Sequence, residues 1–352
     1  MRQYVLKRLL LMIPTLFGVM LITFAVTQFV PGGPVEQLIQ QLRHGGEMGG
    51  EAGGGFTEGL YRGSQGLDAE RIEEFRALYG FDRPAHERFF EMMGNYLTFN
   101  LGDSYFYQQS VSELIVSKLP VSISLGLWIF LLTYLISIPL GVAKAVRDGT
   151  PFDTVTSTLV LVGYAIPGFV LGIALLVLFG GGSFWDLFPL RGLVSDNWQE
   201  LPWYGKILDY LWHLVLPITA MAVGSFAIMT MLTKNSFLEE IRKQYVLTAR
   251  AKGAGQKRVL YGHVFRNALI PLVTNFPAAF IGAFFTGSLL IETIFSLDGL
   301  GLLAYEAVLA RDYPVVLGTL YVFTLIGLVA KLLSDLSYVL IDPRIQFEAV
   351  NR

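Results

Sequence analysis

The sequence predicts an all-α, polytopic membrane protein with six transmembrane helices. Of its 352 residues, 53% are hydrophobic and only 15% are charged, whereas about 25% are charged in a typical soluble domain. It also contains six apolar runs of about the 20 residues that a helix needs to cross the hydrocarbon core. These runs cover residues 9–30, 121–143, 154–179, 214–233, 268–291 and 313–330. The apolar character of the last one continues past Lys331 and Asp335 to Ile341.

The first run is expected to stay in the membrane rather than to be cleaved. It is longer than the apolar part of a signal peptide, and no small-residue cleavage pattern follows it. Arg2, Lys7 and Arg8 precede it and favour a cytoplasmic N-terminus. The alternate loops at 144–153 and 234–267, with the tail after 341, are richer in Lys and Arg per residue than the other loops. Both termini are therefore predicted to be cytoplasmic.

The loops suggest three regions along the chain. Residues 1–30 form the cytoplasmic end and first span, 31–120 an extracytoplasmic cap, and 121–352 the core with its cytoplasmic loop 234–267. The cap contains a glycine-dense stretch at 45–55 and two expected helices, at 68–79 and near 86–97. The outer loop 180–213 holds Trp185, Trp198, Trp203 and Trp212. These tryptophans are typical of an interfacial belt, with a lid over a ligand as the alternative.

Several function classes lack support in the composition. The chain has no cysteine and a net charge of −2, which excludes thiolate metal sites and gives no overall attraction to nucleic acid. It has no nucleotide-binding fingerprint and no zinc-protease motif, and neither His213 nor His263 has a partner at ligand spacing. We therefore expect no catalytic residue, no metal site and no cofactor bound by this chain. A proton-coupled transporter would need ionisable residues at the midplane of the spans and usually internal repeats, and neither is evident.

The cytoplasmic loop 234–267 is more structured than topology requires. Residues 238–251 predict one helix, Gly253 and Gly255 interrupt it, and a second helical pattern starts near Gln256. Gly255 is expected to close the first helix in a left-handed conformation. The basic residues could simply mark the cytoplasmic side. Alternatively, small residues at Ala249, Ala251, Gly253 and Ala254 could let the backbone of a separate motor protein approach.

Two motifs in and after this loop carry a family resemblance. "YVLTARAKG" (245–253) and "HVFRNALIP" (263–271) resemble the cytoplasmic signature of ABC importer permeases of the dipeptide/oligopeptide branch. Further motifs of that branch are "YGFDRP" (79–84), "LGDSY" (101–105), "GSLLIETIFSLDGLGLL" (287–303), "ARDYPVV" (310–316) and "DPRI" (342–345). More narrowly, "FWDLFPLRGLVS" (184–195) resembles the Yej-type permeases, which are associated with oligopeptides and the peptide–nucleotide antibiotic microcin C.

The resemblance implies a type I ABC importer permease fold in a bacterial inner membrane, without catalysis by this chain. The family's Glu-Ala-Ala pattern, with its later glycine, falls on Leu247, Thr248, Ala249 and Gly253, so a contact made by its glutamate cannot be transferred. The implied coupling residues are Tyr245, Thr248, Ala249, Arg250, Ala251, Lys252, Gly253, Ala254 and Gly255.

The resemblance also implies partners. These are a second, homologous permease, an extracytoplasmic peptide-binding protein, membrane lipid, and ABC ATPase subunits, separate or fused, that bind ATP and Mg. A permease of the same family for another small solute, such as a dipeptide, nickel or a sugar, is the alternative.

Charged and polar residues at the ends of two spans are further candidates. Glu292, with Ser288 and Phe285, could form an outer gate or pathway, and Glu292 could meet the ammonium group of a peptide. The alternatives are a solvated helix end for Glu292 and core packing for Phe285. Lys331 and Asp335 are four residues apart and can pair on one helix face. They would lie at the cytoplasmic headgroups if the sixth helix ends near Ala330.

Overall fold

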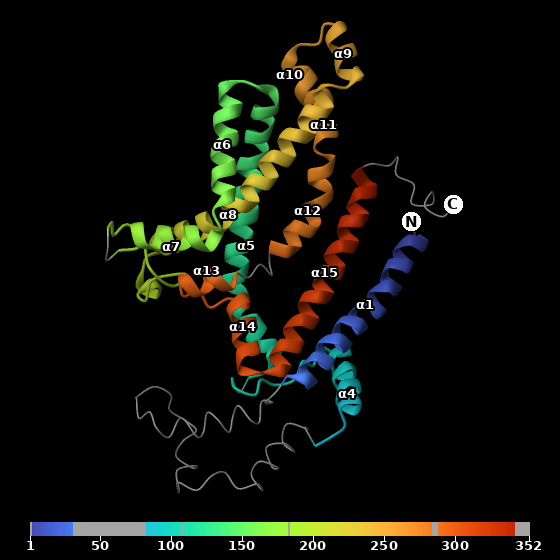
Figure 1. Ribbon diagram of the computed structural model, residues 1–352, viewed down its shortest axis with the longest axis vertical. Helices are drawn as coiled ribbons and strands as arrows, with labels where there is room; N and C mark the ends of the chain where they lie inside the picture. The colour runs from blue at the N-terminus through green and yellow to red at the C-terminus, as the bar shows by residue number, and fades with distance from the viewer. Residues whose placement is uncertain (1, 31–81, 108, 182–183, 284–287, 342–352) are drawn as a thin grey trace. The chain divides into compact units, whose positions relative to one another are not determined.

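The computed structural model describes residues 2–30, 82–107, 109–181, 184–283 and 288–341, which are mostly helical (Figure 1). Within these ranges, β-pairing is limited to two isolated bridges, Asp103–Ser110 and Gly180–Asp186. The expected helix at 68–79 and the glycine-dense stretch at 45–55 lie outside the described residues. The helix expected near 86–97 is confirmed as α4 (Ala85–Leu97).

Four long apolar helices confirm four of the predicted spans. They are α1 (Arg2–Phe29), α5 (Val111–Val146), α8 (Trp203–Ile241) and α15 (Tyr313–Ile341). Each is long and apolar enough to cross a membrane. The sixth span runs past Ala330 to Ile341, where the continued apolar character of the sequence predicts it can end. The condition of a helix end near Ala330 is therefore not met.

The third predicted span is not one straight helix. Residues 154–179 fall into α6 (Pro151–Ala165) and α7 (Gly168–Phe179), which meet at an angle of 94°. The break lies at Pro167, which lacks an N–H and disfavours helical backbone in the residue before it. Ile166 accordingly has φ −86° and ψ 119°. Two helices therefore replace the single one expected.

The fifth predicted span is also divided. It begins with α12 (Ile270–Ala283), and α13 (Leu289–Ile294) is a separate short helix. The helical stretch 256–274 and the following 276–283 together are apolar enough to span, with a bend of 44° between them. The apolar run 268–291 thus extends beyond the helix that it predicts. Counting each bent pair as one span, the described residues provide up to six spans by length and composition.

The chain divides into two compact units. One contains residues 1–12, 116–303 and 323–352, and the other contains residues 13–115 and 304–322. In the second unit, Ser104 donates a hydrogen bond to the buried Asp312, which lies two residues after the end of α14 (Leu300–Ala310). The Ser104 Oγ in turn accepts the backbone N–H of Tyr107 at 2.9 Å. Two of the motifs that carried the resemblance, 208 residues apart, are held together by this link.

Candidate functional site

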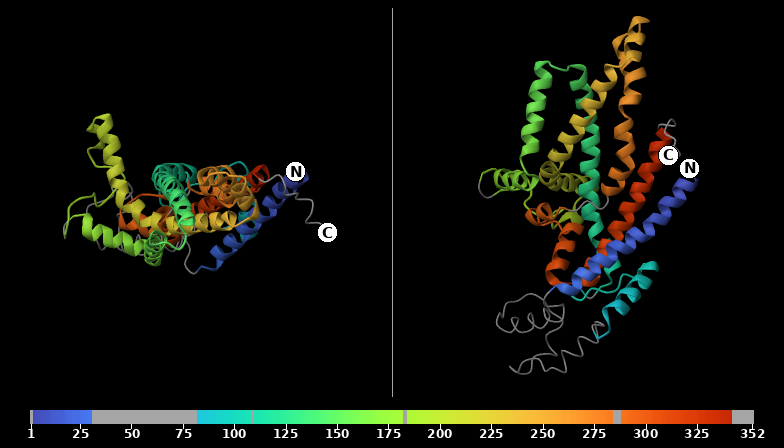
Figure 2. Two further views of the ribbon diagram at one scale, coloured as in Figure 1. Left: turned by 90° about the horizontal axis from the view of Figure 1, so that it is seen from above. Right: turned by 45° about the vertical axis from the view of Figure 1, so that its right-hand side comes forward.

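The predicted cytoplasmic loop forms a compact group of short helices between α8 and α12 (Figure 2). They are α9 (Gln244–Ala251), α10 (Gln256–Val259), a π-helical turn (Leu260–Val264) and α11 (Phe265–Ala268). We refer to them together as the 244–268 segment. The order predicted from the sequence, a helix, a glycine break and a short helix before the chain returns to the next span, is confirmed.

The helix expected over 238–251 is broken at its middle. Instead, α8 ends at Ile241 and Lys243 is extended, with φ −72° and ψ 151°. The break turns the chain so that Val246, which is 0% exposed, enters an apolar cluster. Tyr245 reinforces the corner, since its hydroxyl donates to Glu240 Oε2 at 2.7 Å. Burial and the neighbouring Glu240 raise the pKa of Tyr245.

Gly253, and not Gly255, closes α9 in the left-handed conformation. Gly253 has φ +82°, its N–H donates to Arg250 O at 2.9 Å, and the N–H of Ala254 donates to Ala249 O at 3.1 Å. These two bonds form the helix-terminating arrangement that favours glycine at this position. Gly255 instead has φ −65° and precedes α10, so the expectation for Gly255 was wrong by two residues.

The 244–268 segment rests on a buried apolar base. Val246, Val259 and Val264 are at most 2% exposed. They belong to one cluster with Val142 and Ala145 of α5, Phe237 of α8, and Ala268. Because burying a large aliphatic side chain contributes roughly 1.5–3 kcal/mol, this base ties the segment to the ends of two membrane helices.

The predicted coupling residues divide between the base and the surface. Tyr245, Ala249 and Ala254 are half-buried and pack against the apolar cluster. The small size of the two alanines therefore serves packing inside the segment. The residues that face outward are Thr248, Arg250, Ala251, Lys252, Gly253 and Gly255.

Sequence reasoning did not select two large, exposed apolar side chains of the 244–268 segment. Leu247 is 58% exposed and Tyr261 is 62% exposed. Leu247 occupies the position where the family pattern has glutamate. This difference from the pattern could have pointed to Leu247 as an exposed apolar residue of the segment. Together with the exposed Arg250 and Lys252, Leu247 and Tyr261 give the outer face of the segment both apolar and basic side chains.

Glu292 is buried, so the expectation of a solvated helix end was wrong. Its side chain is 0% exposed in α13. Oε1 accepts the N–H of Ser288 at 3.0 Å, and Oε2 accepts the N–H of Leu302 at 2.6 Å. Desolvation raises the pKa of Glu292, and these N–H groups oppose the shift in part. Ser288 is half-buried at the start of α13, and Phe285 lies outside the described residues.

The predicted pairing of Lys331 with Asp335 is confirmed, with an Nζ–Oδ1 distance of 3.3 Å. Asp335 also pairs with Arg8 of α1 at 3.0 Å and accepts the hydroxyl of Tyr4 at 3.1 Å. The sequence did not indicate these two partners, because they lie more than 300 residues away. Asp335 therefore also connects the beginning of α1 to the last part of α15.

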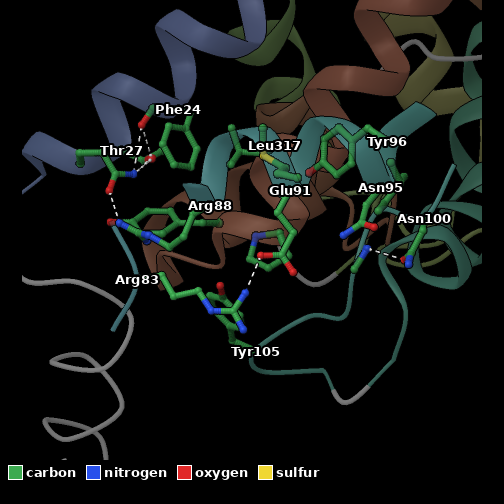
Figure 3. A pocket seen from close by; sticks show the side chains of 16 residues that line it. Phe24, Thr27, Arg83, Arg88, Glu91, Asn95, Tyr96, Asn100, Tyr105 and Leu317 are labelled. Atoms are coloured by element: carbon green, nitrogen blue, oxygen red, sulfur yellow. Dashed lines mark hydrogen bonds and ion pairs between the residues drawn. The ribbon is translucent and has the colours of Figure 1, made fainter. Parts of the chain in front are cut away.

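A cavity of about 400 Å³ lies in the second unit (Figure 3). Two of its arginines have polar partners within the wall: Arg83 Nη1 lies 2.9 Å from Glu91 Oε2, and Arg88 Nη2 donates to Gln28 Oε1 at 2.6 Å. The wall includes Phe24, Thr27, Gln28, Arg83, Arg88, Glu91, Met92, Asn95, Tyr96, Asn100, Leu101, Gly102, Tyr105, Tyr313, Pro314 and Leu317. None of the predicted coupling or gate residues that the structure describes lines it. Among the residues described, no group of three or more His, Asp or Glu is placed to hold a metal ion.

Comparison with known proteins agrees with the motifs. Residues 137–347 match the family described as binding-protein-dependent transport system inner membrane component. The chain is 58% identical to the peptidoglycan transport system permease protein YejB of Agrobacterium fabrum, over 99% of both chains. It is 55% identical to the inner membrane ABC transporter permease protein YejB of Escherichia coli O157:H7, over 99% of this chain and 100% of that one.

A more distant relative belongs to the dipeptide branch. The di/tripeptide transport system permease protein DppB of Pseudomonas aeruginosa is 33% identical over 99% of this chain and 100% of its own length. These similarities confirm the resemblance to ABC permeases that the motifs indicated. The chain belongs to the family of binding-protein-dependent transport system inner membrane components.

Proposed function

We propose that this protein is a transmembrane permease subunit of an ATP-driven peptide importer and that its 244–268 segment docks on the importer's ATPase. As a member of its family, the chain is a membrane subunit and not an enzyme. The observation that carries the docking proposal is the segment's two-sided structure. Its base is buried against α5 and α8, while its outer face is basic and apolar.

The charge of the outer face favours a protein partner with acidic groups. Residues 244–268 contain no Asp or Glu. Arg250, Lys252, Lys257 and Arg258 are all exposed, which suits electrostatic complementarity to an acidic groove. The exposed Leu247 and Tyr261 offer the larger contacts that dominate the free energy of many interfaces.

Peptides are the proposed substrates because of the relatives' names. One relative is named for peptidoglycan transport and another for di/tripeptide transport. The identity of 58% and 55% to two YejB proteins, against 33% to a DppB, favours the Yej type over the dipeptide type. We propose oligopeptides, including peptides derived from peptidoglycan and microcin C-like conjugates, over nickel or sugars.

The proposed assembly contains one further homologous permease, since six spans supply half of the pathway. ATP and Mg would be bound by ATPase subunits, separate or fused, on the cytoplasmic side. An extracytoplasmic peptide-binding protein would dock on loops 31–120 and 180–213. The contact between Arg8 and Asp335 supports termini on the same side, which we propose to be cytoplasmic, and Ser288, Phe285 and Glu292 remain candidates for the outer gate.

Transport would follow from different contacts in two states of the ATPase. Closure of the ATPase around ATP would move the two docked segments together and favour an outward-open pathway. A ligand shifts such an equilibrium only by its difference in affinity for the two states. The permease therefore needs a segment that is firmly attached to the spans, as the buried base of the 244–268 segment is.

Co-purification of the tagged chain from bacterial membranes tests the proposal. The expected result is recovery of a second permease and an ATPase with measurable ATP hydrolysis. Gly255→Trp should abolish this recovery without unfolding the chain, because Gly255 has an ordinary φ and open space around its Cα. Thr158→Trp, at an exposed position of α6, is the matched control. Recovery of the wild-type chain alone would refute the docking of an ATPase.

A further inference from the structure

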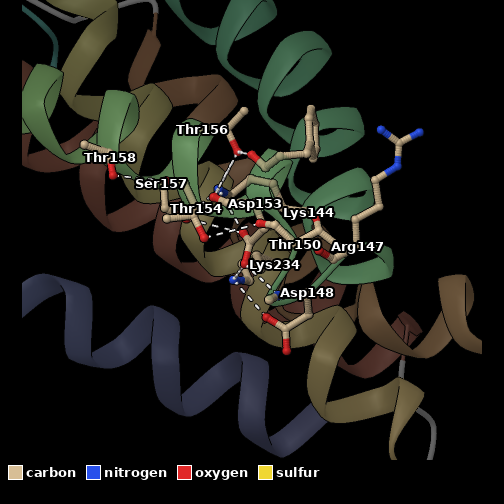
Figure 4. A network of polar contacts seen from close by, with 12 residues as sticks. Lys144, Arg147, Asp148, Thr150, Asp153, Thr154, Thr156, Ser157, Thr158 and Lys234 are labelled. Atoms are coloured by element: carbon tan, nitrogen blue, oxygen red, sulfur yellow. Dashed lines mark hydrogen bonds and ion pairs between the residues drawn. The ribbon is translucent and has the colours of Figure 1, made fainter.

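Buried charged side chains join α5 to α6 and α8 (Figure 4). Lys144 lies two residues before the end of α5, and its side chain is 0% exposed. Its Nζ is 3.2 Å from Asp153 Oδ1 in the first turn of α6. It also donates to Thr156 Oγ1 at 2.9 Å, to Ser157 Oγ at 2.7 Å and to Asp153 O at 3.1 Å. All of these acceptors are on α6.

Asp153 extends the network from α6 to α8. Its Oδ2 is 2.7 Å from Nζ of Lys234, and it accepts the N–H of Gly149 at 3.2 Å. Lys234 also contacts Asp148 Oδ1 at 3.1 Å, in the turn between α5 and α6. The side chains of Lys144 and Asp153 are at most 8% exposed, and that of Lys234 is 12% exposed. Lys144, Asp153, Lys234 and Asp148 thus alternate in charge, and Asp148 also pairs with the exposed Arg242 at 3.4 Å.

Burying these charged side chains has a desolvation cost that apolar side chains at the same positions would not have. Burying an ion pair costs several kcal/mol per ion in desolvation, and apolar residues of similar volume often stabilise a fold equally well. In membrane helices, ionisable residues are rare and usually have a specific role. The geometry here is directional, because each charged group holds a particular partner on another helix. The network therefore defines the register of α5, α6 and α8 more narrowly than apolar contacts would.

The network adjoins the base of the 244–268 segment. Val142 and Ala145, which flank Lys144 on α5, belong to the cluster that buries Val246. Phe237 follows Lys234 on α8 by three residues and is in the same cluster. Close by, α5 and α8 approach so tightly that a Cβ on Gly141 would lie 2.5 Å from the Thr233 Cβ. The same helix ends thus hold the segment and the ion network.

We propose that Lys144, Asp153 and Lys234 are positioning residues that make α6 move together with the 244–268 segment. The network would transmit displacement of the segment through α5 and α8 to α6. The inference rests on the proposed docking of an ATPase on this segment. The three residues are assigned to coupling the movement of α6 to that of the segment, whereas the segment itself is assigned to docking the ATPase.

Reconstitution of the complete importer in lipid vesicles provides the first test. Lys144→Met and Asp153→Asn each remove one charge while keeping similar size. We expect both variants to retain the ATPase and to hydrolyse ATP, while peptide taken up per ATP falls about tenfold. Thr158→Val on the exposed side of α6 is the control and should match wild type. Normal uptake per ATP in both network variants, or equal loss of assembly, hydrolysis and uptake, would overturn the proposal.

A distance measurement separates failure of this proposal from failure of ATPase docking. The chain contains no cysteine, so spin labels can be attached at Gln244→Cys in α9 and Leu159→Cys in α6, both exposed. We expect a narrow distance distribution in the wild-type background, unchanged by ATP, and a broader one in Asp153→Asn. An unchanged distribution in Asp153→Asn would show that the network does not hold α6, whether or not an ATPase is bound. If the wild-type chain recruits no ATPase, the docking proposal fails instead.

Discussion

The backbone N–H of Leu302 donates a 2.6 Å hydrogen bond to Oε2 of Glu292, across ten residues of chain. The other carboxylate oxygen accepts the N–H of Ser288. One buried side chain thereby ties the start of α13 to the beginning of α14. Gly299 makes room for it, since a Cβ there would lie 2.7 Å from the Glu292 Cδ.

We expect Glu292→Gln to lower the free energy of unfolding by about 1–3 kcal/mol, the cost of leaving a buried polar group unsatisfied. Both carboxyl oxygens keep a lone pair that can accept in either protonation state, whereas the amide nitrogen of glutamine cannot accept, so one backbone N–H would face an NH₂ group. Thermal unfolding of the purified chain in detergent measures the change. Glu306→Gln, at an exposed position of α14, should change stability by less than about 0.5 kcal/mol. Equal stability of both variants would contradict the structural role of Glu292.

The contribution of Glu292 to stability should fall as the pH rises. Burial raises its pKa above the ordinary 4.5, so the folded state favours the protonated carboxyl. This contribution is fully present below the unfolded pKa and is lost as the pH rises through the folded pKa. Asp312, whose pKa burial also raises, is present in both wild type and Glu292→Gln. The difference in their unfolding free energies, measured from about pH 4 to 8, should therefore show the wild-type advantage decreasing. A wild-type advantage that grew with pH would refute the assigned direction.

Gly253 and Gly255 should respond differently to the same substitution. Gly253→Ala places a side chain at φ +82°, which costs about 1–2 kcal/mol for an L-residue. Gly255→Ala fits φ −65° without strain. Thermal unfolding should therefore detect a loss only for Gly253→Ala. Identical unfolding temperatures for the two variants would argue against the left-handed end of α9.

A close approach of α5 to α12 makes Gly126 indispensable for packing. A Cβ at this position would lie 1.7 Å from the backbone O of Ala283. We expect Gly126→Ala to destabilise by about 1–3 kcal/mol, the usual range for overpacking. Gly94→Ala is the matched control, because Gly94 lies inside α4 with open space around it. It should stabilise by about 0.5–1 kcal/mol, as measured by thermal unfolding, and no difference between the two would refute the close contact.

Local patterns predicted the features of this chain that depend on neighbouring residues. The apolar runs identified the spans because a bilayer demands length and hydropathy, which are additive along a sequence. The glycine pair located the break in the cytoplasmic loop, although it did not identify which glycine turns left-handed. That choice depended on hydrogen bonds from Gly253 and Ala254 back into α9.

The charged residues show that local patterns cannot predict contacts between residues far apart in the chain. Lys331 and Asp335 could be paired from their spacing on one helix face, but Arg8 could not be added, since only packing brings α1 to α15. Lys144 gave no signal, because a lysine near the end of an apolar run normally suggests an exposed cytoplasmic boundary. Its burial by Asp153 and α6 became evident only in the folded chain.

The sequence by itself determined the membrane class, the family and the position of the cytoplasmic segment, because hydropathy and motifs are properties of contiguous residues. Only the tertiary structure decided the 94° angle at Pro167, the burial of Glu292 and the outward face of α9. These features arise from contacts between residues far apart in the chain. Their free energies depend on which side chains meet, and an apolar run carries no information about its partner.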